Sequence, residues 1–306
     1  MKRLAIFALM TIAVAAAAQT TGQPAQTAPA GSPPAPTQTT KRLPQTKTQP
    51  EFDAWKAFDT GSRPTAEEQA AAQKSAGDAQ QVAAAVASRT EKAAEDFAVK
   101  FPDSEVRILL YKVAMRNYQN ANNAEKTEAM GRKALALDPD DPEALVMVSG
   151  VITEQTHDSD LDRDQRYDEA MKMATKSLTT VDTDISVPPG TPQERLDAYK
   201  AGLRSQAYYV MGTIDFNKGN FAAAQASLQK SIDEYPAQPD PLAVLRLALA
   251  LDRQDKYPEA LKVANRAVEL TQEGTQLGTW SRNERNRLQQ LTAGTAPAPQ
   301  AQPPKN

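Results

Sequence analysis

The segment from Gln206 to Pro236 constrains the fold of this chain more than any other stretch. Its sequence, QAYYVMGTIDFNKGNFAAAQASLQKSIDEYP, predicts two helices joined by a tight turn. Gly219 is suited to end the first helix in a left-handed cap. Gly212 lets the second helix lie close to the first, and Phe221 and Leu228 then fill the space between them. The segment therefore predicts an antiparallel helix pair.

Residues 105–271 contain three further helix pairs in the same register. Asp141-Pro142 and Asp240-Pro241 mark the starts of two of them, because aspartate caps a helix and proline fits its first turn. Their inward-facing positions are occupied by Tyr111, Ala114, Met115 and Ala134, by Leu145, Val148, Ser149, Tyr167, Ala170 and Ala174, and by Val244, Leu247, Ala248, Tyr257, Ala260 and Ala264. Since the continuous β-branched and aromatic runs expected of strands are missing, we predict an all-α fold.

Repeats of ~34 residues with these positions resemble the tetratricopeptide-repeat (TPR) superfamily. The aromatic Tyr208, the small Gly212 and the closing Pro236 fall where that family places such residues. The resemblance implies a TPR-type right-handed α-solenoid of antiparallel helix pairs. We expect Trp280–Leu291 to form the C-terminal capping helix that such a stack requires.

Three positions depart from the repeat pattern. Met115 stands where glycine is usual, Thr127 where alanine is usual, and Asp215 where a large aromatic residue is usual. An oversized core residue costs ~1–3 kcal/mol when its surroundings do not yield. We therefore expect the small residues Ala114 and Gly131 to make room for Met115.

The first 18 residues predict a secretory signal peptide. Lys2 and Arg3 form its basic end, Leu4–Val14 its apolar run, and the small residues up to Ala18 its cleavage site. The apolar run is shorter than the ~20 residues that a membrane-spanning helix needs, so we expect cleavage after Ala18 and no integral membrane anchor. The chain is therefore predicted to be periplasmic or secreted.

The rest of the chain divides by composition. Residues 19–50 are rich in Pro, Thr and Gln, have almost no large apolar side chains, and are predicted to form a disordered tether. Residues 51–104 are predicted to form an N-terminal helical segment, residues 105–293 the TPR domain, and residues 294–306 a disordered tail. The 306-residue chain has no cysteine, so we expect packing alone to stabilise the folded part.

Capping signals place two longer helices. In the N-terminal segment a short helix over Glu51–Phe58 precedes a capping box at Thr65, which opens an alanine-rich helix to Lys100 that we expect to bend at Gly77. A second capping box at Thr191 predicts one long helix over residues 192–218. The first helix of the third repeat should therefore project beyond its neighbours.

The resemblance also implies a concave groove lined by first-helix residues that do not pack on the second helices. When the repeat positions of that family are transferred to this sequence, the residues predicted to line the partner-binding groove are Lys112, Arg116, Gln119, Asn120, Val146, Glu154, Gln206, Tyr209, Thr213, Asn217, Leu245, Asp252 and Arg253. TPR domains that grip a terminal carboxylate use a lysine and asparagines; Lys112 matches, whereas Arg116 replaces an asparagine. The pair is interpreted either as a carboxylate site for a peptide or as a solvated helix face.

An acidic insertion over residues 157–169 carries carboxylates at the spacing of an EF-hand calcium loop, from Asp158 to Glu169. Arg163 stands where that loop needs glycine, and Gln165 where it has an apolar residue. The alternative is a polar loop whose last residues cap the next helix. We favour the polar loop and predict no metal site.

The sequence contains no catalytic signature. His157 is the only histidine, and cysteine and a G-x-S-x-G motif are absent, so nucleophilic hydrolase chemistry is not expected. Gly-rich phosphate loops are absent as well. A formal net charge of -3, without a Lys/Arg cluster interleaved with aromatics, argues against nucleic-acid binding. We expect no catalytic residues and no cofactor.

These features predict an exported, non-enzymatic TPR scaffold that binds a protein or peptide in the cell envelope. The signal peptide and the junction at residues 101–104, FPDS, resemble exported bacterial TPR proteins of uncharacterised function. The lipid-attachment cysteine of the envelope lipoproteins among them is absent. Two alternatives stay open: an envelope hydrolase or enzyme accessory subunit, and a structural envelope protein without a specific groove ligand.

Overall fold

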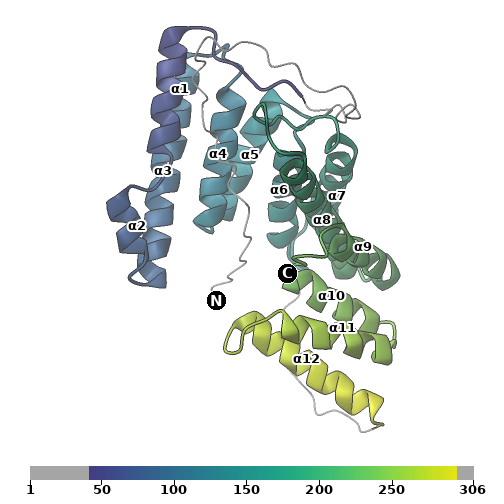
Figure 1. The fold of residues 1–306 in the computed structure, drawn as a ribbon. Helices are drawn as coiled ribbons and strands as arrows, with labels where there is room; N and C mark the ends of the chain where they lie inside the picture. The colour runs from purple at the N-terminus through teal and green to yellow at the C-terminus, as the bar shows by residue number, and fades with distance from the viewer. Residues whose placement is uncertain (1–40, 295–306) are drawn as a thin grey trace, which may run out of the picture.

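The computed structural model describes residues 41–294, and the predictions for the signal peptide, for residues 19–40 and for residues 295–306 lie outside this range. Within it all regular structure is α-helical, as predicted (Figure 1). The helices are α1 (Gln49–Gly61), α2 (Ala66–Ala72), α3 (Ala76–Lys100), α4 (Arg107–Asn120), α5 (Ala124–Leu137), α6 (Pro142–Glu154), α7 (Arg163–Thr180), α8 (Gln193–Asn217), α9 (Phe221–Glu234), α10 (Pro241–Asp252), α11 (Tyr257–Glu269) and α12 (Gln276–Thr292). None of these helices has both the length and the apolar composition of a membrane-crossing segment.

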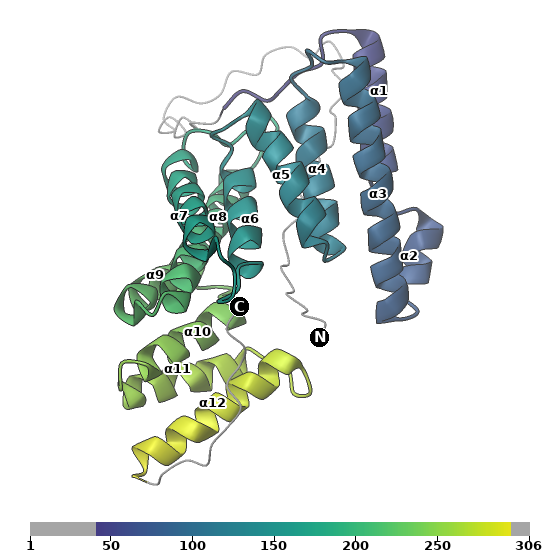
Figure 2. The ribbon, with the colours of Figure 1, turned by 180° about the vertical axis from the view of Figure 1, so that it is seen from behind.

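From α2 onward consecutive helices pack against each other along the chain, and α1 packs on α3, which makes the molecule an α-solenoid. α4 pairs with α5, α6 with α7, α8 with α9 and α10 with α11, as the four predicted repeats require. α3 packs on α4 at the N-terminal end, and α12 packs on α11 where the capping helix was expected. The stack is curved: α3 and α4 stand upright in Figures 1 and 2, whereas α10, α11 and α12 run across the view.

The third repeat has the close helix packing expected from its sequence. A Cβ atom on Gly212 would lie 2.7 Å from Cγ of Leu228 and 3.1 Å from its backbone nitrogen, so glycine is needed for the approach of α9 to α8. Leu228 is fully buried. Gly219 has a φ of +83°, the left-handed conformation that ends α8. Phe221 packs edge-on against Phe216 with ring centroids 5.5 Å apart.

The accommodation of Met115 is confirmed as well. Met115 and Ala114 are both completely buried in the first repeat. A Cβ atom on Gly131 would lie 3.0 Å from Sδ of Met115 and would clash with Val148. The missing side chain of Gly131 therefore provides the volume that Met115 occupies.

Two repeats begin as their Asp-Pro pairs predict. The Asp141 carboxylate accepts a hydrogen bond from the backbone N–H of Ala144 at 2.8 Å and caps α6. The Asp240 carboxylate accepts one from the N–H of Leu242 at 2.9 Å and caps α10. In both helices proline occupies the first turn, where its missing N–H costs nothing.

The N-terminal helical segment is more divided than predicted. The capping box at Thr65 is present and opens α2, but α2 ends at Ala72. Ser75 then caps α3 by accepting a hydrogen bond from the N–H of Asp78 at 3.1 Å. The chain therefore forms two helices with a break before Gly77, instead of one helix bent at that glycine, because serine supplies a fresh start signal.

The long helix of the third repeat is present as α8, which has 25 residues. The capping box predicted at Thr191 is not formed: Pro192 holds the N-cap position, and the Thr191 hydroxyl donates to the carbonyl of Pro188 at 2.6 Å. The additional turns of α8 bury Leu196 and Leu203 in a small core with side chains from the preceding loop. The loop residues of this core are Val181, Ile185 and Val187.

Residues 41–48 differ from the tether that was predicted for them. They run from the start of α1 over the ends of α4 and α5, visible as the purple line at the top of Figure 1. The Lys41 N–H donates to the carbonyl of Ile185 at 2.9 Å, and the Lys41 ammonium lies 2.6 Å from a carboxylate oxygen of Asp138. Composition gave no sign of this ordering, because it depends on acids that are distant in sequence.

Candidate interaction surface

The basic pair predicted for the groove, Lys112 and Arg116, lies together on α4 but faces acids of the next repeat. The Arg116 guanidinium forms a two-point ion pair with Glu143, in which Nη2 lies 2.6 Å from Oε2. The Lys112 ammonium lies 2.6 Å from Asp141 and 3.0 Å from Glu143. The Tyr199 hydroxyl, from the additional turns of α8, donates to the same Glu143 carboxylate at 2.9 Å. Three helices meet at this carboxylate.

Glu143 is the centre of this cluster and only 1% of its side chain is exposed. Burial acts to raise its pKa, but Arg116 and Lys112 outweigh burial and hold the pKa well below the usual range. Burial likewise acts to lower the pKa of Lys112, and Asp141 and Glu143 reverse that effect and raise it. Two cations therefore face two carboxylates, and the cluster is charged but balanced.

Lys112 and Arg116 were predicted either to hold a partner's carboxylate or to form a solvated helix face. Their carboxylate comes from the chain itself, through Glu143 and Asp141. Glu143 was not among the predicted site residues, because an acid in the first turn of a helix is already explained by the helix dipole. The only sequence signal for its role was its place directly after Asp141-Pro142.

Other predicted groove residues serve packing between repeats. Asn217 is buried and donates to the Tyr167 hydroxyl at 3.1 Å, so it belongs to the core between the second and third repeats. Asp252 pairs with Arg287 of α12 at 2.5 Å and holds the capping helix. Also buried are the predicted groove residues Val146, Tyr209, Thr213 and Leu245.

The remaining predicted groove residues keep contact with solvent. Gln119, Glu154 and Gln206 are half-buried, and Asn120 and Arg253 are exposed. The Arg253 guanidinium carbon lies 6.0 Å from the ring centroid of Phe221. These side chains come from α4, α6, α8 and α10 or the residue that follows it, so each repeat contributes at least one.

A further cation, Arg246, lies between α8 and α10 and had no signal in the repeat pattern. The half-buried Arg246 donates to the Thr213 hydroxyl, and its guanidinium carbon lies 5.2 Å from the ring centroid of Tyr209. No carboxylate oxygen of residues 41–294 lies within 4.0 Å of its nitrogens. The Tyr209 hydroxyl is buried without a hydrogen-bond partner in the same range, and burial raises its pKa. Within the described residues, Arg246 thus has no ion-paired acid of the kind that balances Lys112 and Arg116.

The starts of α6 and α10 differ in sequence at the residue after the proline. The start of α6 reads Asp141-Pro142-Glu143, whereas the start of α10 reads Asp240-Pro241-Leu242. Leu242 therefore stands at the helix position of Glu143. Arg246 lies one turn later on the same helix, whereas Arg116 lies on α4 and meets Glu143 across two helices. Asp240 is in electrostatic range of Arg246, but burial raises the pKa of its carboxyl and its oxygen caps α10.

The acidic insertion does not bring its carboxylates together. Glu169 pairs with Arg132 of α5 at 2.8 Å, and Asp158 lies 3.4 Å from Arg163. Asp160 accepts a hydrogen bond from the His157 N–H at 2.8 Å. In the part of the chain that the structure describes, no three potential metal ligands are grouped. The insertion has the contacts of a polar interhelix loop.

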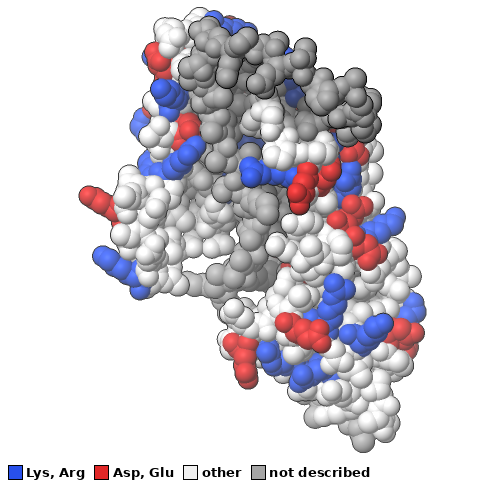
Figure 3. Space-filling model, viewed as in Figure 1, with Lys and Arg blue, Asp and Glu red and all other residues white. Residues whose placement is uncertain are grey.

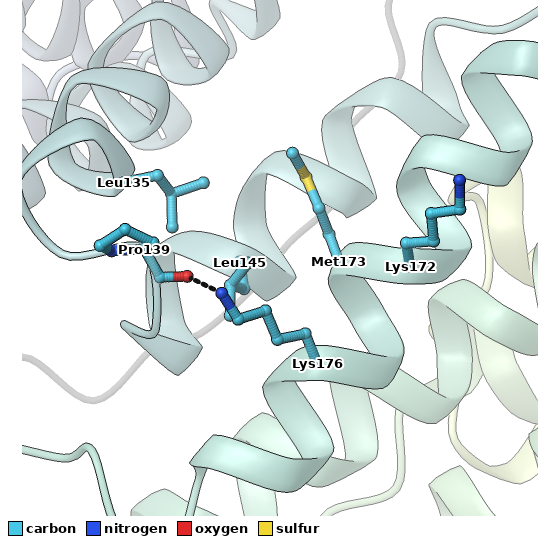
Figure 4. Close-up of a pocket in the computed structure, with 6 residues that line it drawn as sticks. All are labelled: Leu135, Pro139, Leu145, Lys172, Met173 and Lys176. Atoms are coloured by element: carbon cyan, nitrogen blue, oxygen red, sulfur yellow. Dashed lines mark hydrogen bonds between the residues drawn. The ribbon is translucent and has the colours of Figure 1, made fainter.

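A pocket of about 290 Å³ lies among α5, α6 and α7, and Arg246 is not part of its lining (Figure 4). Its walls are mainly apolar and come from Leu135, Pro139, Leu145 and Met173. Lys176 closes one side, donating to the Pro139 carbonyl at 2.7 Å. On the face shown in Figure 3, basic and acidic side chains are interspersed, without one dominant sign.

The fold and these contacts define an all-helical repeat protein, an α-solenoid whose first helices carry both a balanced and an unbalanced cationic site. No family model matches the chain, and no curated protein matches it. Among solved structures, a similar chain is the Assembly Chaperone of RpL4 (Acl4), residues 1-338, with 12% identity and a TM-score of 0.35. The similarity covers 80% of this chain and 99% of that one.

Proposed function

We propose that this protein is an exported, non-enzymatic scaffold that binds a protein or peptide in the cell envelope, through the side of the solenoid formed by α4, α6, α8 and α10. The observation that carries this proposal is Arg246, a cation held in place by Thr213 and Tyr209 with no acid in contact among residues 41–294. An acidic group of the partner would supply the missing carboxylate.

The first site shows what such a carboxylate does. Glu143 joins α4 to α6 by accepting from Arg116 and Tyr199 at once. At Arg246 an incoming carboxylate would meet a guanidinium already oriented by a hydroxyl and an aromatic ring, so little side-chain freedom remains to be lost on binding. Charge-assisted hydrogen bonds from arginine to carboxylate are among the stronger polar contacts.

Neighbouring residues fit a peptide better than a small molecule. Gln206 lies one turn before Tyr209 on α8, and Arg253 follows the end of α10, so polar side chains continue along both helices from Arg246. An extended peptide could contact these side chains in series while its acidic group lies at Arg246. The predicted export fits this role, because it would place the scaffold in the envelope.

The proposal is tested by affinity capture from envelope extract, followed by titration of the identified partner against the purified full chain. Arg246→Gln should weaken binding by about tenfold or more, which is the effect of losing about 1.4 kcal/mol. Arg285→Gln is the matched control, since Arg285 lies on α12 and its hydrogen-bond partner within residues 41–294 is its neighbour Asn286. Equal affinity of wild type and Arg246→Gln would contradict the proposal.

Export is tested separately by N-terminal sequencing of the protein recovered from the envelope fraction. We expect the mature chain to begin at Gln19. Recovery of the uncleaved chain from the cytoplasm would contradict the proposed location while leaving the binding experiment valid.

A further inference from the structure

Residues 41–48, here called the strap, contact three loops that are far apart in the sequence. These loops join α3 to α4, α5 to α6, and α7 to α8. Each loop connects one layer of the stack to the next. The distances between the loops therefore change when the angle between the layers changes. In a helical repeat stack each unit otherwise contacts only its neighbours.

One end of the strap is fixed to the second and third loops. The Lys41 ammonium lies 2.6 Å from Asp138 and 3.3 Å from Asp184 and so bridges the two loops. Its backbone N–H donates to Ile185, and the Ser186 hydroxyl donates to the Arg42 carbonyl at 3.3 Å. Main-chain and side-chain contacts therefore act at the same place.

The other end of the strap is fixed to the first loop and to α1. The Lys47 ammonium donates to the Asp103 carbonyl at 3.1 Å, and the side chain of Arg42, from the opposite end, also reaches the first loop and pairs with Glu105 at 2.7 Å. The Lys47 N–H donates at 2.6 Å to Glu51, a buried acid that also accepts from Ser104. The strap thus spans from the first loop to the third.

We propose that the strap sets the curvature of the N-terminal half of the solenoid and can be detached to release it. A segment of fixed length that joins the first loop to the third prevents the layers between them from opening or closing. Its ion pairs are partly exposed, with 63% of Arg42 and 39% of Glu105 accessible, so each contact is individually weak. Cleavage at its basic residues, or an acidic competitor, would remove the restraint.

The experiment measures distances between spin labels attached to introduced cysteines. The chain has no native cysteine that would have to be removed first. Exposed positions Ala84 on α3 and Thr175 on α7, each changed to cysteine, report on the part that the strap spans. A second label pair at Thr175 and Asn283 on α12 reports on the C-terminal part, which the described strap contacts do not reach.

In the full chain, Lys41→Ala with Arg42→Ala should broaden the α3–α7 distance distribution and leave the α7–α12 distribution unchanged. Asp138→Asn with Asp184→Asn removes the charges on the loop side and should have the same effect, without altering the strap. Lys92→Ala with Arg63→Ala is the matched control. Lys92 pairs with Asp96 and Arg63 pairs with Asp59, and neither ion pair joins different layers of the stack. Unchanged α3–α7 distances in both test variants, or equal broadening at both label pairs, would overturn the proposal.

Discussion

Arg116 on α4 and Glu143 on α6 form a two-point ion pair that joins the first helices of consecutive repeats. Because Glu143 also balances Lys112, its removal leaves two cations without that carboxylate in a buried site. Glu143→Ala should lower the free energy of unfolding by about 3–5 kcal/mol. Urea unfolding followed by circular dichroism measures the change.

The control for this effect is an ion pair that lies in solvent. Lys92 and Asp96 form an exposed pair within α3, and Lys92→Ala should cost less than about 1 kcal/mol. A second variant, Glu143→Leu with Arg116→Leu, should recover part of the loss because it removes one uncompensated charge. A loss below about 1 kcal/mol for Glu143→Ala would show that water compensates the cations.

Two glycines of α8 should respond to alanine with opposite signs. Gly212→Ala places a methyl group against Leu228 and should cost about 1–3 kcal/mol. Gly202→Ala meets nothing within 4 Å and should stabilise the helix by about 0.5–1 kcal/mol. Thermal unfolding of both variants tests this, and equal effects would refute the close approach of α8 and α9.

Acid should weaken the attachment of α2 to α3. The hydrogen bond from Arg89 and the N–H of Thr65 lower the pKa of Glu68 from 4.5 to about 2. A carboxylate with a lowered pKa stabilises the fold fully above its unfolded pKa, and this contribution is lost as the pH falls from 4.5 towards 2. Glu68→Gln should therefore be less stable than wild type by about 1 kcal/mol at neutral pH. This difference should vanish near pH 2; a constant difference would contradict the assignment.

The capping helix should depend on Arg287. Its guanidinium pairs with Asp252 of α10 at 2.5 Å and with Glu284 at 2.9 Å, and only 10% of the Asp252 side chain is exposed. Arg287→Ala leaves that acid unpaired and should cost about 1–3 kcal/mol. Hydrogen exchange should accelerate in α12 and stay unchanged in α4 and α5. The same acceleration in Arg285→Ala would point to general fraying of α12.

Local signals made the helix pairs predictable. Gly212, Gly219 and the Asp-Pro starts act within a few residues of themselves, and the structure places each as expected. The capping box at Thr191 failed because Pro192 took the N-cap position one residue later. A short motif of this kind fixes a helix start only to within a residue or two.

The candidate site was harder to predict because its charges are balanced across repeats. Lys112 and Arg116 were recognised as basic, but their partner Glu143 lies 27 residues after Arg116. Arg246 was not predicted either, because its distinction is that no acid among residues 41–294 forms an ion pair with it, and ion pairing depends on three-dimensional placement. The strap contacts of Lys41, which reach residues 97 and 143 positions away, have no local signal either.

The extra turns of α8 make the third repeat different from an interchangeable module. Leu196 and Leu203 cover the loop that contains Ile185, and that loop in turn holds Lys41. Tyr199 on the same turns reaches Glu143 two helices earlier. A recombination event that duplicated or deleted this unit would separate partners that only this copy provides. The third repeat is therefore not interchangeable with its neighbours, whereas the units of an ordinary solenoid can be exchanged one at a time.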